Sequence, residues 1–391
     1  MRLASSFLPA TLKSGMTRLF HTADLHLGLR FTRSGYSPDL RDRLVARRLE
    51  CLREMVALAM ERECHLFVIA GDLFDNLRIP RYLIRETAEA LARFEGIVVV
   101  LPGNHDYAQE GDPLWPEFAD ALGERHHLLG HETPCDLREQ GVPLVLFPGV
   151  CQARHSKTPA ISWVAEALAT LALPPEVRRV GVAHGSLEGL SPDFGGDYFP
   201  MTRRDLETTG MDLWLLGHTH VRFPDRDRIE GDRILFPATP EPDGFDCRHG
   251  GYAWLLDLAD DGSLTGESIR TGHHRFHTLT KTLSGEASLE ELRAQMASYD
   301  PSRDLVKLSL TGRIPGALFE TRGEWLAEWE QSVLYLETDT SDLLREITEA
   351  DIGREFTIRS FPHRLLSGLA GEDGDAEALQ LAWDLVKEAR A

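Results

Sequence analysis

The chain has 391 residues, more than one hydrophobic core usually serves, so its length predicts two domains or more. With 42% hydrophobic and 27% charged residues, the composition is that of a globular protein and excludes disordered, collagen-like and coiled-coil classes. The formal net charge of −20 argues against a sequence-independent nucleic-acid coat, which needs a broad basic surface. It leaves open a nucleic-acid enzyme whose carboxylates hold metal ions.

No apolar run approaches the roughly 18 residues that a transmembrane helix needs, so we expect a cytoplasmic protein that does not enter a membrane. Residues 1–17 lack the continuous apolar segment of a signal peptide and are expected to form a disordered leader. The five cysteines are odd in number, scattered and never spaced C-x-x-C. They are predicted to be reduced thiols rather than a disulfide framework or a zinc site.

From residue 18 to 258 one pattern repeats: an apolar run of strand length is followed by a polar residue that can bind a metal. Continuous rather than alternating apolar runs predict strands that are covered on both faces. Helical spacing of apolar residues predicts helices over Asp39–Glu61 and from Pro80 to about Phe94. We therefore expect an α/β sandwich of layered sheets and helices over residues 18–275. The predicted strands are Leu19–Phe20, Leu66–Ala70, Ile97–Leu101, Leu144–Phe147, Val180–Ala183, Leu213–Leu216, Ile234–Phe236 and Tyr252–Leu258.

Residues 281–391 have a different pattern and are predicted to form a smaller α+β domain. Helices are expected over Leu289–Met296 and Trp325–Leu336, with strands over Leu305–Leu310 and Thr357–Phe361. A terminal helix is expected over residues 376–390, with Asp375 as its N-cap. Its apolar stripe, with Trp383 beside it, is equally compatible with docking a partner and with packing on its own domain. The stripe consists of Leu379, Ala382, Val386 and Ala389.

Five polar clusters follow predicted strands, where open α/β sheets place their ligands. Taken alone, each is explained by a turn, a helix cap or a buried core histidine, but five in succession favour a metal site. Imidazole, carboxylate and amide donors without thiolate suit manganese, iron or zinc better than calcium, and they suit two ions that share a carboxylate. The clusters are Asp24-Leu25-His26, Gly71-Asp72-Leu73-Phe74-Asp75, Gly103-Asn104-His105-Asp106, His184-Gly185 and Gly217-His218-Thr219-His220.

On these residues the chain resembles the calcineurin-like metallophosphoesterases, and among them the SbcD-type DNA repair exonucleases. The supporting segments are His21 to Gly28, Gly71 to Asp75 and Pro102 to Asp106. The resemblance is dense over residues 18–260 and looser beyond. It implies a four-layer α/β sandwich nuclease domain over residues 18–275 and a capping domain over residues 281–391 that shapes a DNA cleft.

The resemblance also implies a division of labour among the site residues. His105 would protonate or stabilise the leaving oxygen, Asp106 would orient His105, and Asp75 would support the ligands. The cofactor would be two divalent ions, with manganese expected and iron or zinc as alternatives. One ion would be held by Asp24, His26, Asp72 and His220. The other would be held by Asp72, Asn104, His184 and His218, so that Asp72 bridges the two ions.

Basic residues near these motifs are the remaining indication of a substrate. Arg30 and Arg33 follow the first motif and are predicted to bind a backbone phosphate. A second group lies on the helix expected over Asp39–Glu61, and either a solvated helix face or phosphate contact accounts for it. That group is Arg41, Arg43, Arg47 and Arg48.

The sequence therefore predicts a two-metal DNA phosphodiesterase, acting as an exonuclease or endonuclease in DNA repair. Its alternatives are a phosphodiesterase for a small nucleotide and a metal-stabilised scaffold that binds DNA ends. The resemblance implies an SbcC-like coiled-coil ATPase as a partner. It also implies a homodimer, since family members pair through helices at this place. The helix over Asp39–Glu61 has more apolar residues than one core-facing stripe needs, which fits either such pairing or burial on two sides within its own domain. The residues on the second face are Leu40, Leu44, Cys51, Met55 and Leu58, with Tyr82 on the following helix.

Overall fold

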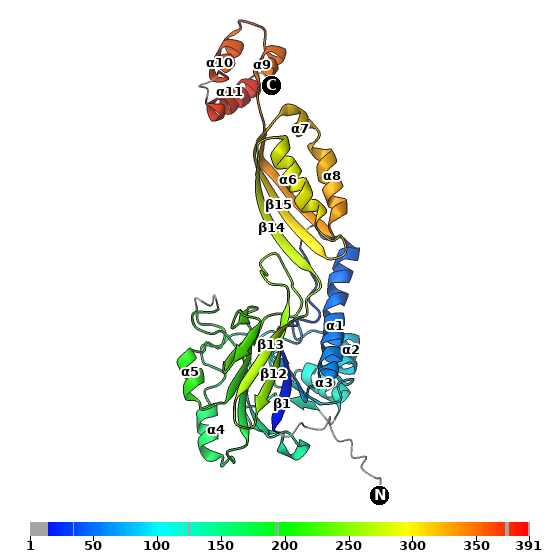
Figure 1. The fold of residues 1–391 in the computed structure, drawn as a ribbon, viewed down its shortest axis with the longest axis vertical. Helices are drawn as coiled ribbons and strands as arrows, with labels where there is room; N and C mark the ends of the chain where they lie inside the picture. Colours follow the sequence, from blue (N-terminus) through cyan, green and yellow to red (C-terminus); the bar gives the residue numbers. More distant parts are fainter. Residues whose placement is uncertain are drawn as a thin grey trace. The chain divides into compact units, whose positions relative to one another are not determined.

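A computed structural model describes residues 15–33, 35–123, 126–191, 193, 195–371 and 375–389. The chain divides into two compact units, one ending at Arg275 and the other beginning at Phe276 (Figure 1). Residues 1–14 of the predicted leader lie outside the described residues. Met16 and Thr17, which were also assigned to the leader, instead begin the first strand.

The first unit contains two β-sheets. One has the strand order β10-β13-β12-β1-β2-β3-β4, and β1 to β4 in it run parallel. Its strands are β1 (Met16–Thr22), β2 (Leu66–Ala70), β3 (Ile97–Leu101), β4 (His126–Leu128), β10 (Arg228–Glu230), β12 (Tyr252–Ala259) and β13 (Leu264–Arg270). The other has the order β5-β6-β7-β8-β11-β9, with β6, β7 and β8 parallel. Its strands are β5 (Cys135–Asp136), β6 (Leu144–Gly149), β7 (Arg178–His184), β8 (Leu213–Gly217), β9 (Arg222–Phe223) and β11 (Ile234–Pro237).

Helices cover the outer faces of the two sheets, so the first unit has four layers (Figure 1). Alternate residues of a strand point to opposite faces. Phe20 therefore packs toward the helices α1 (Pro38–Glu61), α2 (Arg81–Leu91) and α3 (Leu114–Leu122), whereas Leu19 packs between the sheets. On the other side Leu146 points inward, and Phe147 packs with α4 (Val164–Thr170) and α5 (Arg203–Thr208). The predicted four-layer α/β sandwich is confirmed.

Helix α1 is buried on two sides within its own unit. Ser37 caps it by accepting a hydrogen bond from Leu40 N at 3.2 Å, and Pro38 occupies the first turn. Leu44 and Met55, two of the residues that suggested a dimer, are each 1% exposed. The excess apolar residues of α1 are thus largely explained by packing within one chain.

The second unit contains the sheet β14-β15-β16, with β15 and β16 parallel. Its strands are β14 (Arg275–Leu283), β15 (Asp304–Ile314) and β16 (Tyr335–Arg345), and its first helices are α6 (Glu286–Ala297), α7 (Gly316–Glu320) and α8 (Arg322–Ser332). Trp325 and Trp329 of α8 pack with Met296 of α6 on the sheet. The helix predicted over Trp325–Leu336 was wrong at its end, because Tyr335 already pairs with Leu305 in the sheet.

In the described part of the second unit, β16 is followed by the helices α9 (Glu349–Glu355), α10 (Phe361–Leu369) and α11 (Ala376–Glu388). The strand predicted over Thr357–Phe361 was wrong. Ser360 instead caps α10 by accepting a hydrogen bond from His363 N at 3.3 Å. Leu379 and Trp383 of α11 pack with Phe356, and Ala382 and Val386 of the predicted stripe join the same cluster, whereas Ala389 is exposed. Among the described residues, no helix combines the length and apolar character required to cross a membrane.

Candidate metal centre

Potential metal ligands follow strands of both sheets in the first unit. The parallel strands β1, β2 and β3 lie in one sheet, and β7 and β8 lie parallel in the other. Because the carboxyl ends of parallel strands share one edge of a sheet, the loops after them can converge. The polar residues that the structure brings together there are Asp24, His26, Asp72, Asn104, His105, His184, His218 and His220.

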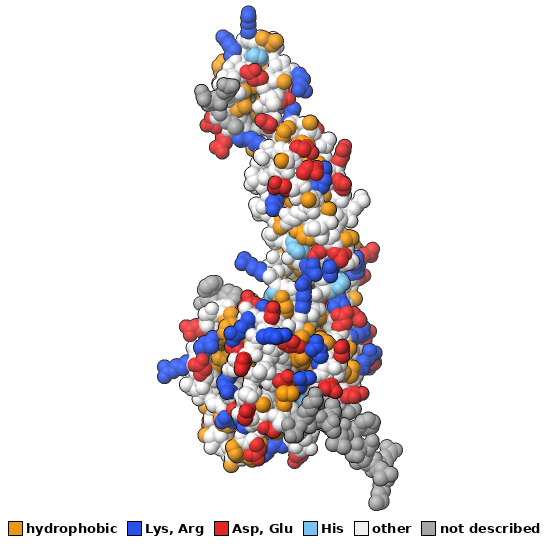
Figure 2. Space-filling model, viewed as in Figure 1, with side chains coloured by type: hydrophobic (Ala, Val, Ile, Leu, Met, Phe, Trp, Pro, Cys, Tyr) orange, Lys and Arg blue, Asp and Glu red, His pale blue; other side chains and the backbone are white. Residues whose placement is uncertain are grey.

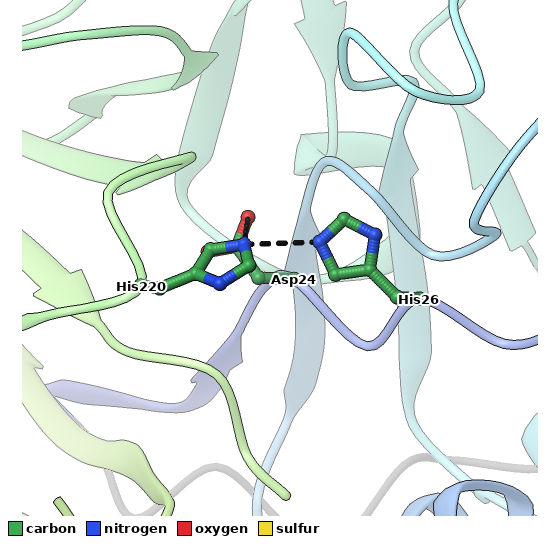
Figure 3. Close-up of side chains that lie close together, drawn as sticks. All are labelled: Asp24, His26 and His220. Carbon is green, nitrogen blue, oxygen red and sulfur yellow. Dashed lines mark hydrogen bonds and ion pairs between the residues drawn. The ribbon is translucent and has the colours of Figure 1, made fainter. Parts of the chain in front are cut away.

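Asp24, His26 and His220 form the first group of potential ligands (Figure 3). The Nε2 atoms of His26 and His220 are 3.0 Å apart, and Asp24 Oδ1 lies 3.8 Å from His220 Nε2. Two imidazole nitrogens that face each other so closely need a proton or a cation, because their lone pairs repel. The group therefore suits one metal ion.

A second group gathers around Asn104. Its Oδ1 atom lies 3.0 Å from His184 Nε2 and 3.0 Å from His218 Nδ1. Asn104 Nδ2 faces the carbonyl oxygen of Arg154 at 3.5 Å, which leaves the amide oxygen directed at the histidines. His184 donates Nδ1–H to the carbonyl oxygen of Ala70 at 2.9 Å, so its Nε2 can serve as a ligand.

Two carboxylates connect the groups. Asp72 Oδ2 lies 3.6 Å from His26 Nε2 and 3.3 Å from His184 Nε2, so a single oxygen atom faces both groups. Asp24, which the resemblance assigned to the first ion alone, also clusters with Asp72 and His184. Both acids are therefore within reach of both groups.

The backbone at the potential ligands adopts conformations that L-residues rarely take. Asp24, His26, Asp72, His218 and His220 have φ angles of 57°, 45°, 50°, 105° and 52°. Non-glycine residues in this region cost about 1–3 kcal/mol each and persist where the surrounding structure holds them, commonly at functional sites. Strain at five potential ligands indicates that the fold is built to aim these side chains.

The carboxylates of the centre are buried, and buried negative charge needs a nearby positive charge to stabilise it. Asp24 and Asp72 are each 1% exposed, and burial raises the pKa of Asp24. Burial lowers the pKa of His184, but the charge and hydrogen bond of Asp72 outweigh it and raise that pKa to about 9. Among the described residues, His26 Nδ1 is buried without a hydrogen-bond partner. Neighbouring carboxylates with nitrogen and oxygen donors fit divalent ions such as manganese, iron or zinc.

The sequence profile of the calcineurin-like phosphoesterase family matches residues 17–222, a little over half of the chain. The chain belongs to the calcineurin-like phosphoesterases. Members of this family use divalent metals, in agreement with the donor set described above.

Two curated relatives are similar to this phosphoesterase. It is 30% identical over 216 residues to an uncharacterized metallophosphoesterase, YhaO, of Bacillus subtilis, covering 52% of this chain and 48% of the relative. It is 25% identical over 308 residues to the DNA double-strand break repair protein Mre11 of Haloferax volcanii, covering 76% and 62%. The chain thus spans about half to three fifths of these relatives. A solved structure, TT1561 of Thermus thermophilus, has 14% identity and a TM-score of 0.40, covering 66% of this chain and 99% of that one.

His105 lies beside the first group of this phosphoesterase. Its ring meets that of His26 edge-on, with the centroids 4.8 Å apart. His105 Nδ1 lies 3.0 Å from the carbonyl oxygen of Asp75. Since a carbonyl can only accept, Nδ1 carries the hydrogen and Nε2 is the atom left for proton exchange.

Asp106 does not orient His105 as the sequence analysis expected. Its carboxylate accepts hydrogen bonds from Phe74 N at 2.8 Å and Gly103 N at 2.7 Å, and no hydrogen bond joins it to His105 among the described residues. Burial and the charge of Asp72 raise the pKa of Asp106 to about 8. Asp106 therefore ties together the loops that follow β2 and β3.

The prediction for Arg48 was wrong. Arg48 is neither on a solvated face nor placed for phosphate contact, since its side chain is 2% exposed. Its guanidinium donates to the carbonyl oxygens of Leu25 at 2.5 Å, Glu241 at 3.2 Å and Asp24 at 3.4 Å. Thr239 Oγ1 also donates to the Asp24 carbonyl, at 2.9 Å. Arg48 thus supports the strained turn that carries the potential ligands Asp24 and His26.

Two acids complete the surroundings of the histidines. Asp75 Oδ1 lies 3.7 Å from His26 Nδ1, and Asp243 Oδ2 lies 3.6 Å from His220 Nδ1. Carboxylates placed behind metal-binding histidines orient the ring and raise its basicity. Asp75 was expected in this supporting role, whereas Asp243 lies in a Pro- and Gly-containing loop without a motif that could have identified it.

Gly71 makes room for a ligand, which a substitution can test. A Cβ atom at Gly71, where φ is 93°, would overlap the imidazole ring of His184. We expect Gly71→Ala to displace His184 and to reduce metal content, in addition to about 1–2 kcal/mol for a side chain at positive φ. Gly141→Ala is the matched control, because its φ is 84° and nothing lies within 4 Å. Equal metal content in the two variants, measured by mass spectrometry, would contradict this role.

Proposed function

We propose that this phosphoesterase is a two-metal DNA nuclease, the nuclease subunit of an SbcCD-like complex. The observation that carries the proposal is the position of Asp72 Oδ2, 3.6 Å from His26 Nε2 and 3.3 Å from His184 Nε2. A carboxylate oxygen placed there can bridge two ions. When bound, two divalent ions would supply an activated water and stabilise the charge that develops in an in-line displacement at phosphorus.

The proposed ligand sets follow the two groups of side chains. Manganese is the proposed metal, with iron and zinc as the alternatives that the same donors accept. Asp24, His26, Asp72 and His220 would hold one ion. Asp72, Asn104, His184 and His218 would hold the other.

His105 is proposed to protonate the leaving oxygen through Nε2. We expect His105→Ala to keep its metal content and to lose roughly 10²–10⁴-fold in turnover, the range typical of a lost general acid. His131→Ala, a change at an exposed histidine, should leave turnover unaltered. Steady-state kinetics and metal analysis together check the assignment, and loss of metal in His105→Ala would make it a ligand instead.

DNA is the proposed substrate because of the Mre11 similarity, which spans 76% of the chain and therefore extends beyond the unit that ends at Arg275. The net charge of −20 is less favourable, and on the face shown in Figure 2 basic and acidic side chains are interspersed. The decisive assay offers manganese-loaded protein duplex DNA, single-stranded DNA and bis-p-nitrophenyl phosphate. Hydrolysis of the last alone would favour a small-nucleotide phosphodiesterase, and DNA binding without hydrolysis would favour a scaffold.

An SbcC-like coiled-coil ATPase is the proposed partner, and it would supply the basic DNA surface that this acidic chain lacks. Since Leu379, Ala382 and Val386 of the stripe pack within the chain, the candidate contact moves to Leu381 and Leu385, which are 62% and 55% exposed. We expect the double change Leu381→Glu and Leu385→Glu to abolish co-purification with the ATPase while small-substrate hydrolysis is retained. Co-purification at the wild-type level would exclude this face.

We also propose a homodimer. Helix α1 gives it less support than its sequence suggested, because Leu44 and Met55 are buried within one chain. Tyr82 of α2, which was predicted to belong to the pairing face, is 65% exposed and presents a large apolar surface. Light scattering at micromolar concentration would report a dimer if the proposal holds and a monomer if it does not.

A further inference from the structure

A pocket of about 440 Å³ lies next to the first group of metal ligands. Three loops form it, those that follow β1, β2 and β11. The first two loops are joined through Leu27, whose N donates to Leu73 O at 2.9 Å and whose O accepts from Asp75 N at 3.0 Å. The side chains that matter for its chemistry are Arg30, Arg33, Tyr36, Asn76, Phe245 and Asp246.

The loop after β1 is anchored so that its arginines stay exposed. Phe31 is 7% exposed and has a φ of 48°, an unusual conformation for a bulky residue. Tyr36 is 5% exposed. With these two aromatic side chains buried, Arg30 and Arg33 remain at the surface, and the Arg33 guanidinium lies 5.1 Å from the centre of the Phe245 ring.

The pocket shares two walls with the metal centre. Asp75 and Asp243 line it, and the same residues face His26 Nδ1 and His220 Nδ1. The carbonyl of Asp75 also fixes His105, the proposed donor of the proton to the leaving oxygen. Asp75 therefore connects His105 to the wall of the pocket.

We propose that this pocket binds one unpaired nucleotide, the one that carries the leaving oxygen, with its base against Phe245 and Arg33. This inference rests on the proposed function of the same site. In the hydrolysis, a water molecule releases one proton to the solvent and its oxygen bonds to phosphorus, the bond from phosphorus to the sugar oxygen breaks, and His105 supplies its Nε2 proton to that oxygen. Arg30 would contact the next phosphate along the strand.

The composition of the pocket favours a base over a second phosphate. Arg30 and Arg33 are opposed there by Asp75, Asp243 and Asp246, so the pocket has no excess of positive charge. A neutral, planar base suits such mixed charge, and aromatic rings with arginine are the usual platform for unpaired bases. Its volume lies in the range of small-ligand pockets and is far too small for a duplex.

The test removes one base without changing the bond that is cut. Each substrate is a single-stranded oligonucleotide with one cleavable phosphodiester linkage, and all its other linkages are phosphorothioates. An abasic residue stands on one side or on the other side of the cleavable linkage. For the wild type, we expect the abasic residue to raise KM about tenfold or more on the leaving side and little on the other. Phe245→Ala should raise KM similarly on the normal strand and have no further effect on the abasic one.

Arg33→Ala should raise KM on the normal strand as Phe245→Ala does. Arg203→Ala is its matched control and should leave KM unchanged, because Arg203 lies over Phe223 at 5.4 Å in the same unit. Equal KM changes in Phe245→Ala on normal and abasic strands would overturn the proposal. A second measurement does not depend on cleavage of DNA: calorimetric titration with thymidine monophosphate and with deoxyribose 5-phosphate. Tighter binding of the nucleotide, lost in Phe245→Ala, supports the pocket even if DNA is not the substrate. Equal binding of the two ligands rejects it.

Discussion

Replacing Asp72 with alanine should remove both metal ions and abolish hydrolysis. The reason is geometric, since Asp72 Oδ2 faces His26 Nε2 and His184 Nε2 at 3.6 and 3.3 Å. On the proposed assignment, two ions that share this carboxylate would lose a ligand and a neutralising charge together. By contrast, His220→Ala removes a ligand from the first group alone and should leave about one equivalent of metal.

Metal analysis by mass spectrometry, with melting curves of the metal-free proteins, separates this effect from unfolding. Asp72 Oδ1 also accepts from His105 N at 2.9 Å, so the metal-free variant should lose about 1–3 kcal/mol of stability and remain folded. Two full equivalents of metal in Asp72→Ala would refute the bridging role.

Replacing Arg48 with methionine should destabilise the protein by about 3–5 kcal/mol and weaken metal binding. Methionine can fill the space, but the carbonyl oxygens of Leu25 and Glu241 would then lose a buried donor. The strained turn at Asp24 would lose support, so the first ion should be lost before the second.

Arg53→Met is the matched control on the same helix. Arg53 forms partly exposed ion pairs with Glu50 and Glu86 at 3.3 Å, and such pairs contribute at most about 1 kcal/mol. Chemical denaturation of the metal-free proteins gives the stability, and titration with manganese gives the affinity. Identical manganese affinity in the wild type and Arg48→Met would confine Arg48 to a structural role.

The layered fold was predictable because its signal is local. Strands such as Leu66–Ala70 are continuously apolar and buried throughout, and polar motifs directly follow them. Arg48 could also have been found, because it lies four residues from both Leu44 and Leu52 on the core-facing side of α1. Its charged neighbours Arg41, Arg43 and Arg47 obscure this helical period.

Other features depend on contacts that the sequence does not reveal. Asp243 reaches His220 only through the fold, and its loop carries no motif. The strand predicted over Thr357–Phe361 rested on apolar residues, yet Ile358 and Phe361 are 70% and 72% exposed. Ser360, followed by a proline in the first turn, was the cap signal that should have decided for a helix.

The segment that follows β11 has consequences for protein engineering. Thr239 donates a hydrogen bond to the Asp24 carbonyl, and the Glu241 carbonyl accepts one from Arg48. Asp243 faces His220, and Phe245 lines the pocket. With its prolines and glycine it reads as a surface loop, and such loops usually accept insertions and deletions. Here one added residue would shift all four contacts at once, whereas the open turn at Gly141 offers a place where a tag or linker can be inserted.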